Sequence, residues 1–165
     1  MAAPVLNSAP MPASAAVIDA LNSLLEAELN SVFRFMGEGS PYLSRATVDV
    51  KRPLEEMVVT SDRHAGELSN VIESLGGYPS PRSLRPEEQY LAFLSLKFLL
   101  PKLADEKRLM IRRYENALRA IGTGAPREIL DVLHSHIATH EEHSRLLDKK
   151  AAEAAQAAQA SQARR

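Results

Sequence analysis

The sequence predicts an all-α protein that folds as a four-helix bundle, and three observations support this fold class. Aromatic residues make up only 5% of the 165 residues and tryptophan is absent, which is typical of helical bundles rather than of β-sandwiches or barrels. Apolar residues recur at spacings of three and four over four long segments. Stretches rich in Gly and Pro separate these segments near residues 37–43, 76–86 and 122–126.

The expected helices cover residues 14–36, 44–75, 86–121 and 126–150. Pro53 lies inside the second segment, so we expect a kink there or a helix that starts nearer Pro53. Pro101 likewise divides the third segment into two helices or bends one rod. The connection 76–86 is the only long one, and it joins the second and third helices.

Residues 14–150 therefore form the bundle domain. Residues 1–13 read as a flexible leader rich in Pro, Ala and Ser. Residues 151–165 form an Ala/Gln-rich tail that has no apolar face to dock, so we expect it to fray.

The composition excludes several classes of function. Twenty basic and 21 acidic residues give a net charge of −1, so no general field favours nucleic acid or an anionic membrane as a partner. The absence of cysteine excludes disulfides, thiol catalysis and thiolate metal sites. No apolar run reaches the roughly 20 residues of a membrane span, and the N-terminus lacks the features of a secretory signal. We expect a cytoplasmic protein.

Each expected helix carries polar residues in the middle of its apolar stripe. In the fourth helix the stripe comprises Ile129, Leu133, His136, His140, His143 and Leu147. The central residues are Glu28 in the first helix, Ser61 and His64 in the second, and Glu106 in the third. Buried polar groups need partners, and a divalent cation shared by converging side chains would provide one.

These segments resemble the ferritin-like superfamily, nearest its bacterioferritin branch. LeuAsnSerLeuLeuGluAlaGluLeuAsn (21–30), AspArgHisAlaGlyGluLeu (62–68) and GluGluHisSerArgLeuLeu (141–147) are similar to the first, second and fourth helices of that family. The resemblance implies a ferritin-like four-helix bundle with a long crossover between helices 2 and 3. It also implies metal ligands at Glu28, His64, Glu106 and His143.

The sequence departs from the family at three positions. Ser61 and His140 stand where the family has glutamates that bridge two metal ions. Asp62 stands where bacterioferritins have the methionine that binds haem. The resemblance therefore does not extend to haem, and the loss of both bridging glutamates, which leaves five candidate ligands, favours one metal ion over two.

The candidate metal ligands are Glu28, His64, Glu106, His140 and His143. Among them Glu106, His140 and His143 supply two imidazoles and one carboxylate, a set that suits Fe(II) and also Zn(II) or Mn(II). Iron is our first choice, and it would make Fe(II) oxidation or peroxide consumption possible.

Four further residues lie beside these ligands. Ser61 replaces a carboxylate. His136 is an additional ligand, a hydrogen-bond donor to a ligand, or a boundary residue. Tyr114 packs in the core or hydrogen-bonds to a ligand. Glu141 faces solvent, or replaces His140 as a ligand if the fourth helix rotates slightly.

Two other classes of function stay open. One is a degenerate ferritin-like structural or interaction protein whose polar core is only hydrogen-bonded. The other is a small-molecule-binding bundle with histidines around a pocket. The resemblance implies a homo-oligomer, and we favour a dimer over a closed cage because the leader and the tail must project from the assembly.

Overall fold

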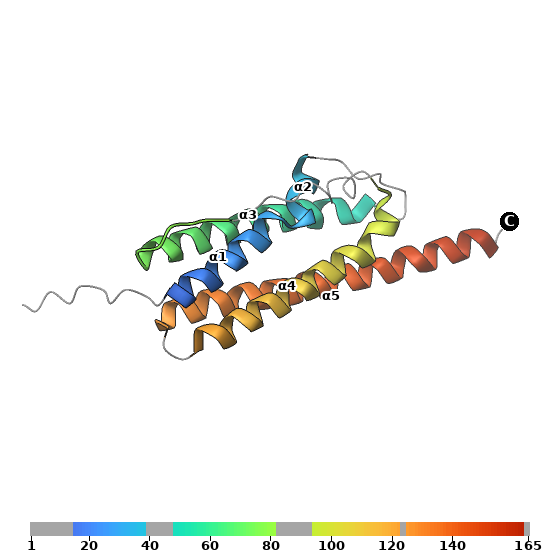
Figure 1. The fold of residues 1–165 in the computed structure, drawn as a ribbon. Helices are drawn as coiled ribbons and strands as arrows, with labels where there is room; N and C mark the ends of the chain where they lie inside the picture. Colours follow the sequence, from blue (N-terminus) through green and yellow to red (C-terminus); the bar gives the residue numbers. More distant parts are fainter. Residues whose placement is uncertain (1–14, 39–47, 82–93, 123–124, 164–165) are drawn as a thin grey trace, which may run out of the picture.

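The computed structural model describes residues 15–38, 48–81, 94–122 and 125–163, and the predicted leader 1–13 lies outside them. All the described elements are helices (Figure 1). In chain order they are α1 (Ala15–Leu29), α2 (Val32–Glu38), η1 (Val48–Val50), α3 (Lys51–Ser74), α4 (Leu96–Ile121) and α5 (Arg127–Ala163). The predicted all-α fold with four long helices is confirmed.

The four long helices pack as two pairs. Figure 1 shows α1 beside α3 in one layer and α4 beside α5 in the other, and each pair is antiparallel. Helix α3 and helix α4 point the same way, so the connection between them must return along the whole bundle. This is the long crossover that the sequence predicted, although its residues 82–93 lie outside the described part of the chain.

The first predicted helix is divided into α1 and α2 at Asn30 and Ser31. The Ser31 hydroxyl accepts a hydrogen bond from the Phe33 backbone N–H over 3.3 Å, which caps the start of α2. Short polar side chains compete in this way for the backbone groups that a continuous helix would use. Helix α2 consequently turns away from the axis of α1 (Figure 1).

The two prolines have different consequences. Pro53 is the third residue of α3, where its missing N–H removes no hydrogen bond from the helix. The prediction of a helix that starts nearer Pro53 is therefore confirmed. Pro101 lies inside α4, which is one continuous helix that begins after the extended residue Ser95.

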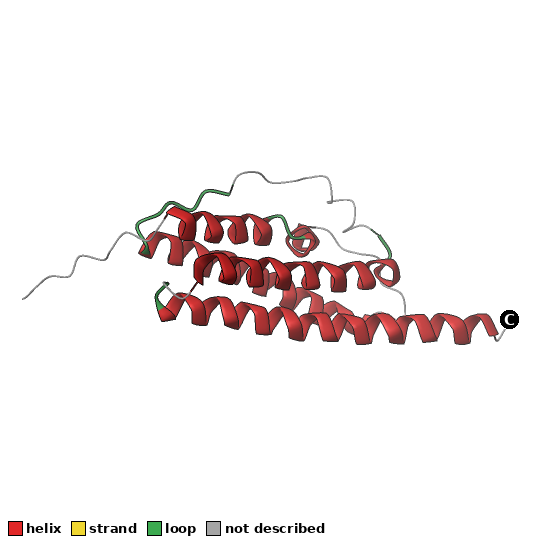
Figure 2. Cartoon of the chain, turned by 60° about the horizontal axis from the view of Figure 1, so that its bottom comes forward, coloured by secondary structure: helices red, strands yellow, loops and turns green. Residues whose placement is uncertain are grey.

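Helix α5 continues to Ala163, which differs from the frayed tail that we expected. Its last turns extend past the end of the bundle in Figure 2. Ala154 is buried and Ala151 packs against the same apolar cluster. The tail does have a small apolar face, because methyl groups suffice for contact where helices approach closely, and alanine has the highest helix propensity.

Two apolar clusters fill the bundle, and a polar layer separates them. One cluster includes Val32, Leu54, Leu103 and Leu147; the other includes Leu25, Leu68, Met110 and Leu133. In α3, α4 and α5 buried polar residues lie between members of the two clusters, and in α1 Glu28 lies between its own cluster and the residues of α2 that belong to the other. These buried polar residues are Glu28, Ser61, His64, Lys107, His136 and His140. The polar residues therefore form one cross-section of the bundle.

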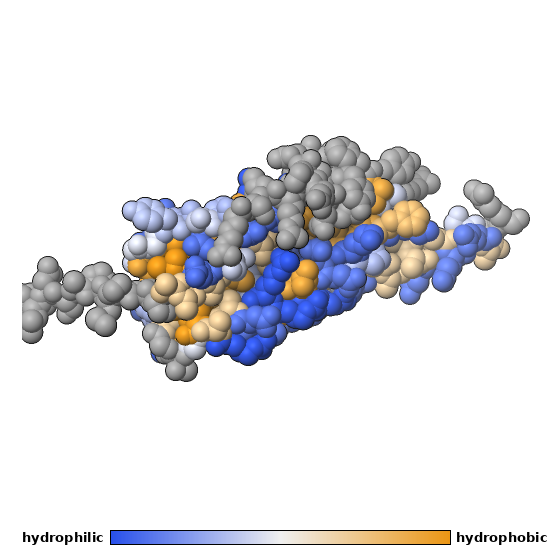
Figure 3. Space-filling view, viewed as in Figure 1, coloured by the Kyte–Doolittle hydropathy of each residue, from blue (hydrophilic) through white to orange (hydrophobic). Residues whose placement is uncertain are grey.

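The outer surface is polar along α4 and α5 on the face that Figure 3 shows, as expected of amphipathic helices. Within the described residues, no helix combines the length and the apolar character that crossing a bilayer requires.

Candidate metal centre

The Glu28 carboxylate is the point at which the four long helices meet. It lies in the last turn of α1 and is 1% exposed. Ser61 Oγ on α3 donates to its Oε2 over 2.8 Å. Tyr114 Oη on α4 and His140 Nε2 on α5 lie 2.9 Å from its Oε1. A side chain from every other long helix is thus hydrogen-bonded to this one carboxylate.

Glu28, His64 and His140 form a group that could hold a metal ion. Each offers one ligand atom, and these atoms lie within 4.8 Å of one another. His140 Nε2 is 2.9 Å and His64 Nδ1 is 3.4 Å from Glu28 Oε1. Ligands bound at about 2.1 Å from one ion are separated by roughly 3.0–3.4 Å. The group is already near the spacing that coordination requires.

The donor set also suits a cation. The buried Nδ1 atom of His64, which lies 3.4 Å from Glu28 Oε1, has no hydrogen-bond partner among the described residues. An unpaired buried nitrogen costs free energy, and a coordinate bond would satisfy it. Two imidazoles and one carboxylate are ligands for Fe(II), Zn(II) or Mn(II).

The pKa values favour the protonation states that metal binding needs. Burial raises the pKa of Glu28, but the hydrogen bond from His140, the nearby His64 imidazole and the charge of Lys107 hold it well below its usual range. Burial lowers the pKa of His140 against the opposing effect of Glu28. The carboxylate is therefore ionised and the imidazole neutral near pH 7, as ligands must be.

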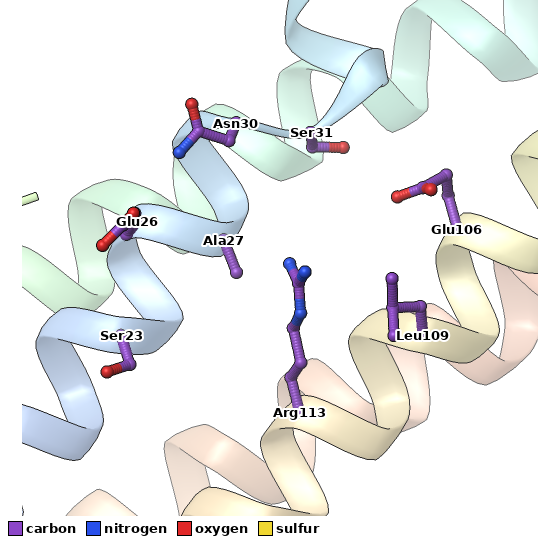
Figure 4. A pocket seen from close by; sticks show the side chains of 8 residues that line it. All are labelled: Ser23, Glu26, Ala27, Asn30, Ser31, Glu106, Leu109 and Arg113. Atoms are coloured by element: carbon purple, nitrogen blue, oxygen red, sulfur yellow. The ribbon is translucent and has the colours of Figure 1, made fainter. Parts of the chain in front are cut away.

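Glu106, which the sequence predicted as a ligand together with His140 and His143, is not part of this group. Its side chain lines a groove of about 230 Å³ between α1 and α4, together with Ser23, Glu26, Asn30 and Arg113. Figure 4 shows the carboxylate of Glu106 and the guanidinium of Arg113 reaching from α4 toward α1. The neighbouring residue Lys107 takes the buried position instead.

The reason for this difference is geometric. Successive helical residues are rotated by about 100°, so residues 106 and 107 lie roughly 50° to either side of the apolar stripe of α4. Spacing alone could not choose between them. Lys107 is 2% exposed, and its Nζ lies 3.9 Å from the centroid of the Phe33 ring.

His143 and Glu141 have different surroundings from His140. His140 is fully buried, whereas Glu141 is exposed and pairs with Arg145 at 2.9 Å. Helix α5 thus directs His140 toward Glu28. The slight rotation of this helix that would have replaced His140 with Glu141 is not observed. His143 is half-buried beside the group, and burial together with the charge of Lys107 lowers its pKa to about 4.

A second line of hydrogen bonds leads from Glu28 toward the surface. Tyr114 Oη lies 3.0 Å from His136 Nδ1, and His136 Nε2 lies 2.6 Å from Glu67 Oε2. His136 also stacks on His64 with ring centroids 3.8 Å apart. The Glu67 side chain is 44% exposed, so the line ends at solvent.

The number of protons along this line limits its hydrogen bonds. Burial lowers the pKa of His136, and Glu67 opposes that shift. A neutral His136 that donates its Nε2 proton to Glu67 has an accepting Nδ1. Tyr114 then has one hydroxyl hydrogen for two acceptors, His136 and Glu28. The network is one proton short of satisfying every contact.

Sequence reasoning missed Lys107 and Glu67. Lys107 has the spacing of its stripe, four residues after Leu103 and three before Met110, but a lysine in a stripe reads as a residue that reaches for solvent. Glu67 is three residues after His64 and so lies on the same side of α3. The helical spacing placed both residues near the inner faces of their helices. Other residues had equally suitable spacing, so the sequence did not single these two out.

Replacing Tyr114 with Phe should lower the free energy of unfolding by about 1–3 kcal/mol, because Glu28 and His136 lose the one hydroxyl hydrogen that they share. Urea unfolding followed by circular dichroism measures this change. Tyr78→Phe is the matched control, since Tyr78 is 86% exposed. Equal stability of the two variants would contradict the network.

Acid should destabilise the fold through its buried histidines. Burial lowers the pKa of His136, His140 and His143 in the folded chain. The unfolded chain therefore takes up protons at a higher pH, and stability falls as the pH decreases from the unfolded value of about 6.5. We expect a loss of roughly 2–4 kcal/mol between pH 7 and pH 4, less than the full shifts because water screens the half-buried His143.

Urea unfolding at several pH values tests this dependence. The variant His143→Gln should have a shallower pH profile than the natural chain. The profile of His134→Gln should be unchanged, since His134 is an exposed histidine of the same helix. A flat profile for the natural chain would show that the imidazoles are not held neutral.

Comparison with known proteins gives a structural match. No protein-family model matches the chain, and no curated protein does. The bacterioferritin-related protein from Bacteroides fragilis, described as a dodecameric thioferritin, superposes with a TM-score of 0.68 at 22% sequence identity, over 87% of this chain and 89% of that one. The present chain contains no cysteine. The chain therefore has the ferritin-like fold that the sequence resemblance implied.

Proposed function

We propose that this protein binds one divalent transition-metal ion through Glu28, His64 and His140. The observation that carries the proposal is the burial of three potential ligand atoms within 4.8 Å of one another at the crossing of the long helices. A carboxylate held by Ser61 and Tyr114 is already oriented toward the two imidazoles. Such preorganised ligands lose little freedom when an ion binds.

Iron is the metal that we propose, with zinc and manganese as alternatives. A carboxylate with two imidazoles suits all three. Bound Fe(II) would supply one-electron redox chemistry, so Fe(II) oxidation or peroxide consumption are the activities to test. The ferritin-like fold and the description of the Bacteroides fragilis protein support iron as the first choice.

The residues around the group have separate tasks in this proposal. If His140 binds the ion through Nε2, its single ring proton would be on Nδ1, because one ring nitrogen cannot hold both a proton and a metal ion. Ser61 and Tyr114 keep the Glu28 carboxylate in place. The two apolar clusters exclude water on either side of the layer and so strengthen its electrostatic interactions.

A metal-free hydrogen-bonded centre is the second candidate. It is favoured by one observation, namely that the Glu28 carboxylate already has Ser61, Tyr114 and His140 as partners. In that case the bundle would act as a structural or interaction protein. A small-molecule site has less support, since no histidine lines either groove between α1 and α4.

Metal content distinguishes the two candidates. Protein prepared without a His tag and loaded anaerobically with Fe(II) or Zn(II) should retain about one ion per chain, measured by inductively coupled plasma mass spectrometry. His140→Ala should lose that ion, because it removes one of three ligands. His134→Ala should retain it, since His134 is exposed on the same helix.

Two outcomes would contradict the proposal. If the natural chain retains no ion, the metal-free hydrogen-bonded centre is supported instead. If both alanine variants retain the ion equally, the ion binds elsewhere. Oxygen uptake on adding Fe(II), measured against buffer and against His140→Ala, then shows whether the bound iron is oxidised at this centre.

We also propose that the chain forms a homo-oligomer. The description of the Bacteroides fragilis protein as dodecameric supports a larger assembly than the dimer that the sequence favoured. Mass photometry should give a particle of about twelve times the chain mass of 18.1 kDa. A particle of twice that mass would support the dimer, and a monomer would contradict both.

A further inference from the structure

Lys107 is a buried cation in the polar layer, and neither the fold nor the proposed ligand set requires one. It is 2% exposed, although lysine is among the residues least often buried. Its Nζ lies 3.9 Å from the centroid of the Phe33 ring. An ammonium over an aromatic face is held by the quadrupole of the ring. The side chain is therefore anchored inside the bundle by α2.

The charge of Lys107 acts directly on the candidate metal group. It contributes to the lowered pKa values of Glu28, His140 and His143. Burial lowers the pKa of Lys107 itself to about 8, against the attraction of Glu28 and Glu106. The ammonium is thus predominantly charged at pH 7, and it belongs to the same layer of buried polar residues as Glu28, His64 and His140.

The charges of the layer nearly balance without a metal ion. Among the described residues that are buried, Glu28 is the single carboxylate and Lys107 the single lysine or arginine. Ser61 and His140 stand at the two positions where the resemblance would have placed further carboxylates. The layer thus has less negative charge and more positive charge than a pair of divalent ions would need.

We propose that the Lys107 ammonium is a built-in cation of this centre, which neutralises Glu28 in the metal-free protein, weakens the binding of a divalent ion and prevents the binding of a second one. The inference rests on the proposed metal site, because it assigns a determinant of that site's affinity and capacity. A positive charge near a divalent ion is repelled strongly in a poorly screened interior. Lys107 therefore competes electrostatically with the metal for the same carboxylate.

The variant Lys107→Met removes the charge and keeps an unbranched apolar side chain against Phe33. We expect it to bind Zn(II) at least about tenfold more tightly than the natural chain, a modest part of the repulsion that Coulomb's law allows. Competition with a chromophoric chelator measures the affinity, and the absorption of bound Co(II) measures the number of ions per chain. Zn(II) should also raise the melting temperature more in the variant, since Glu28 then has no other counter-charge.

Three control variants separate charge from packing. Lys107→Arg keeps the charge and should bind Zn(II) as the natural chain does. Lys102→Met removes an exposed lysine from the same helix and should change nothing. Lys107→Gln removes the charge with a polar side chain, and it replaces the Met variant if circular dichroism or size-exclusion chromatography shows that Met disturbs the fold.

The outcomes distinguish this inference from the proposed function. If the natural chain binds Zn(II) and both uncharged variants bind it no more tightly, the inference is wrong while the proposed site stands. If only the uncharged variants bind, the inference is supported and metal binding by the natural chain is refuted. If no variant binds Zn(II) or Co(II), both are refuted. Tighter binding by Lys107→Arg would also overturn the inference, because that variant retains the charge.

Discussion

A buried carboxylate is costly unless donors or cations surround it, and the interior of this bundle is arranged around that constraint at Glu28. A single ionised group removed from water would lose several kcal/mol of solvation. Ser61, Tyr114 and His140 lie within hydrogen-bonding distance of it, and Lys107 opposes its charge. Because these partners come from three different helices, Glu28 is satisfied only when α3, α4 and α5 have all docked against α1.

The polar layer also defines the register of the bundle. Helices that pack through apolar residues alone can slide past one another at little cost, since one leucine contact replaces another. A carboxylate that must meet a serine, a tyrosine and a histidine at fixed heights does not permit such a shift. The two apolar clusters supply most of the burial, while the layer between them specifies one alignment of the helices.

If the centre binds a metal ion as proposed, the layer has two states. Without a metal ion, hydrogen bonds and the Lys107 ammonium balance Glu28. With a metal ion, His64 and His140 would become ligands and the ammonium would become a repulsive neighbour. The line through Tyr114 and His136 to Glu67 adds a hydrogen-bonded path that is one proton short. The ligand atoms already lie within 4.8 Å of one another, so the proposed states would differ mainly in charge.

The sequence by itself determined the helical fold, the polar middle of each stripe and the inward position of Glu28, His64 and His140. These features follow from the 3.6-residue period and from the cost of burying polar groups, both of which are local properties. The helical period leaves open which residues at the edges of a stripe are buried, and the tertiary structure decided this. Glu106 and Lys107 lie at similar angles from the stripe, and only the packing of α4 against α1 and α2 puts the lysine inside and the glutamate in the outer groove. Glu67 became part of the network because α5 brings His136 against α3, a contact that depends on how two distant helices meet.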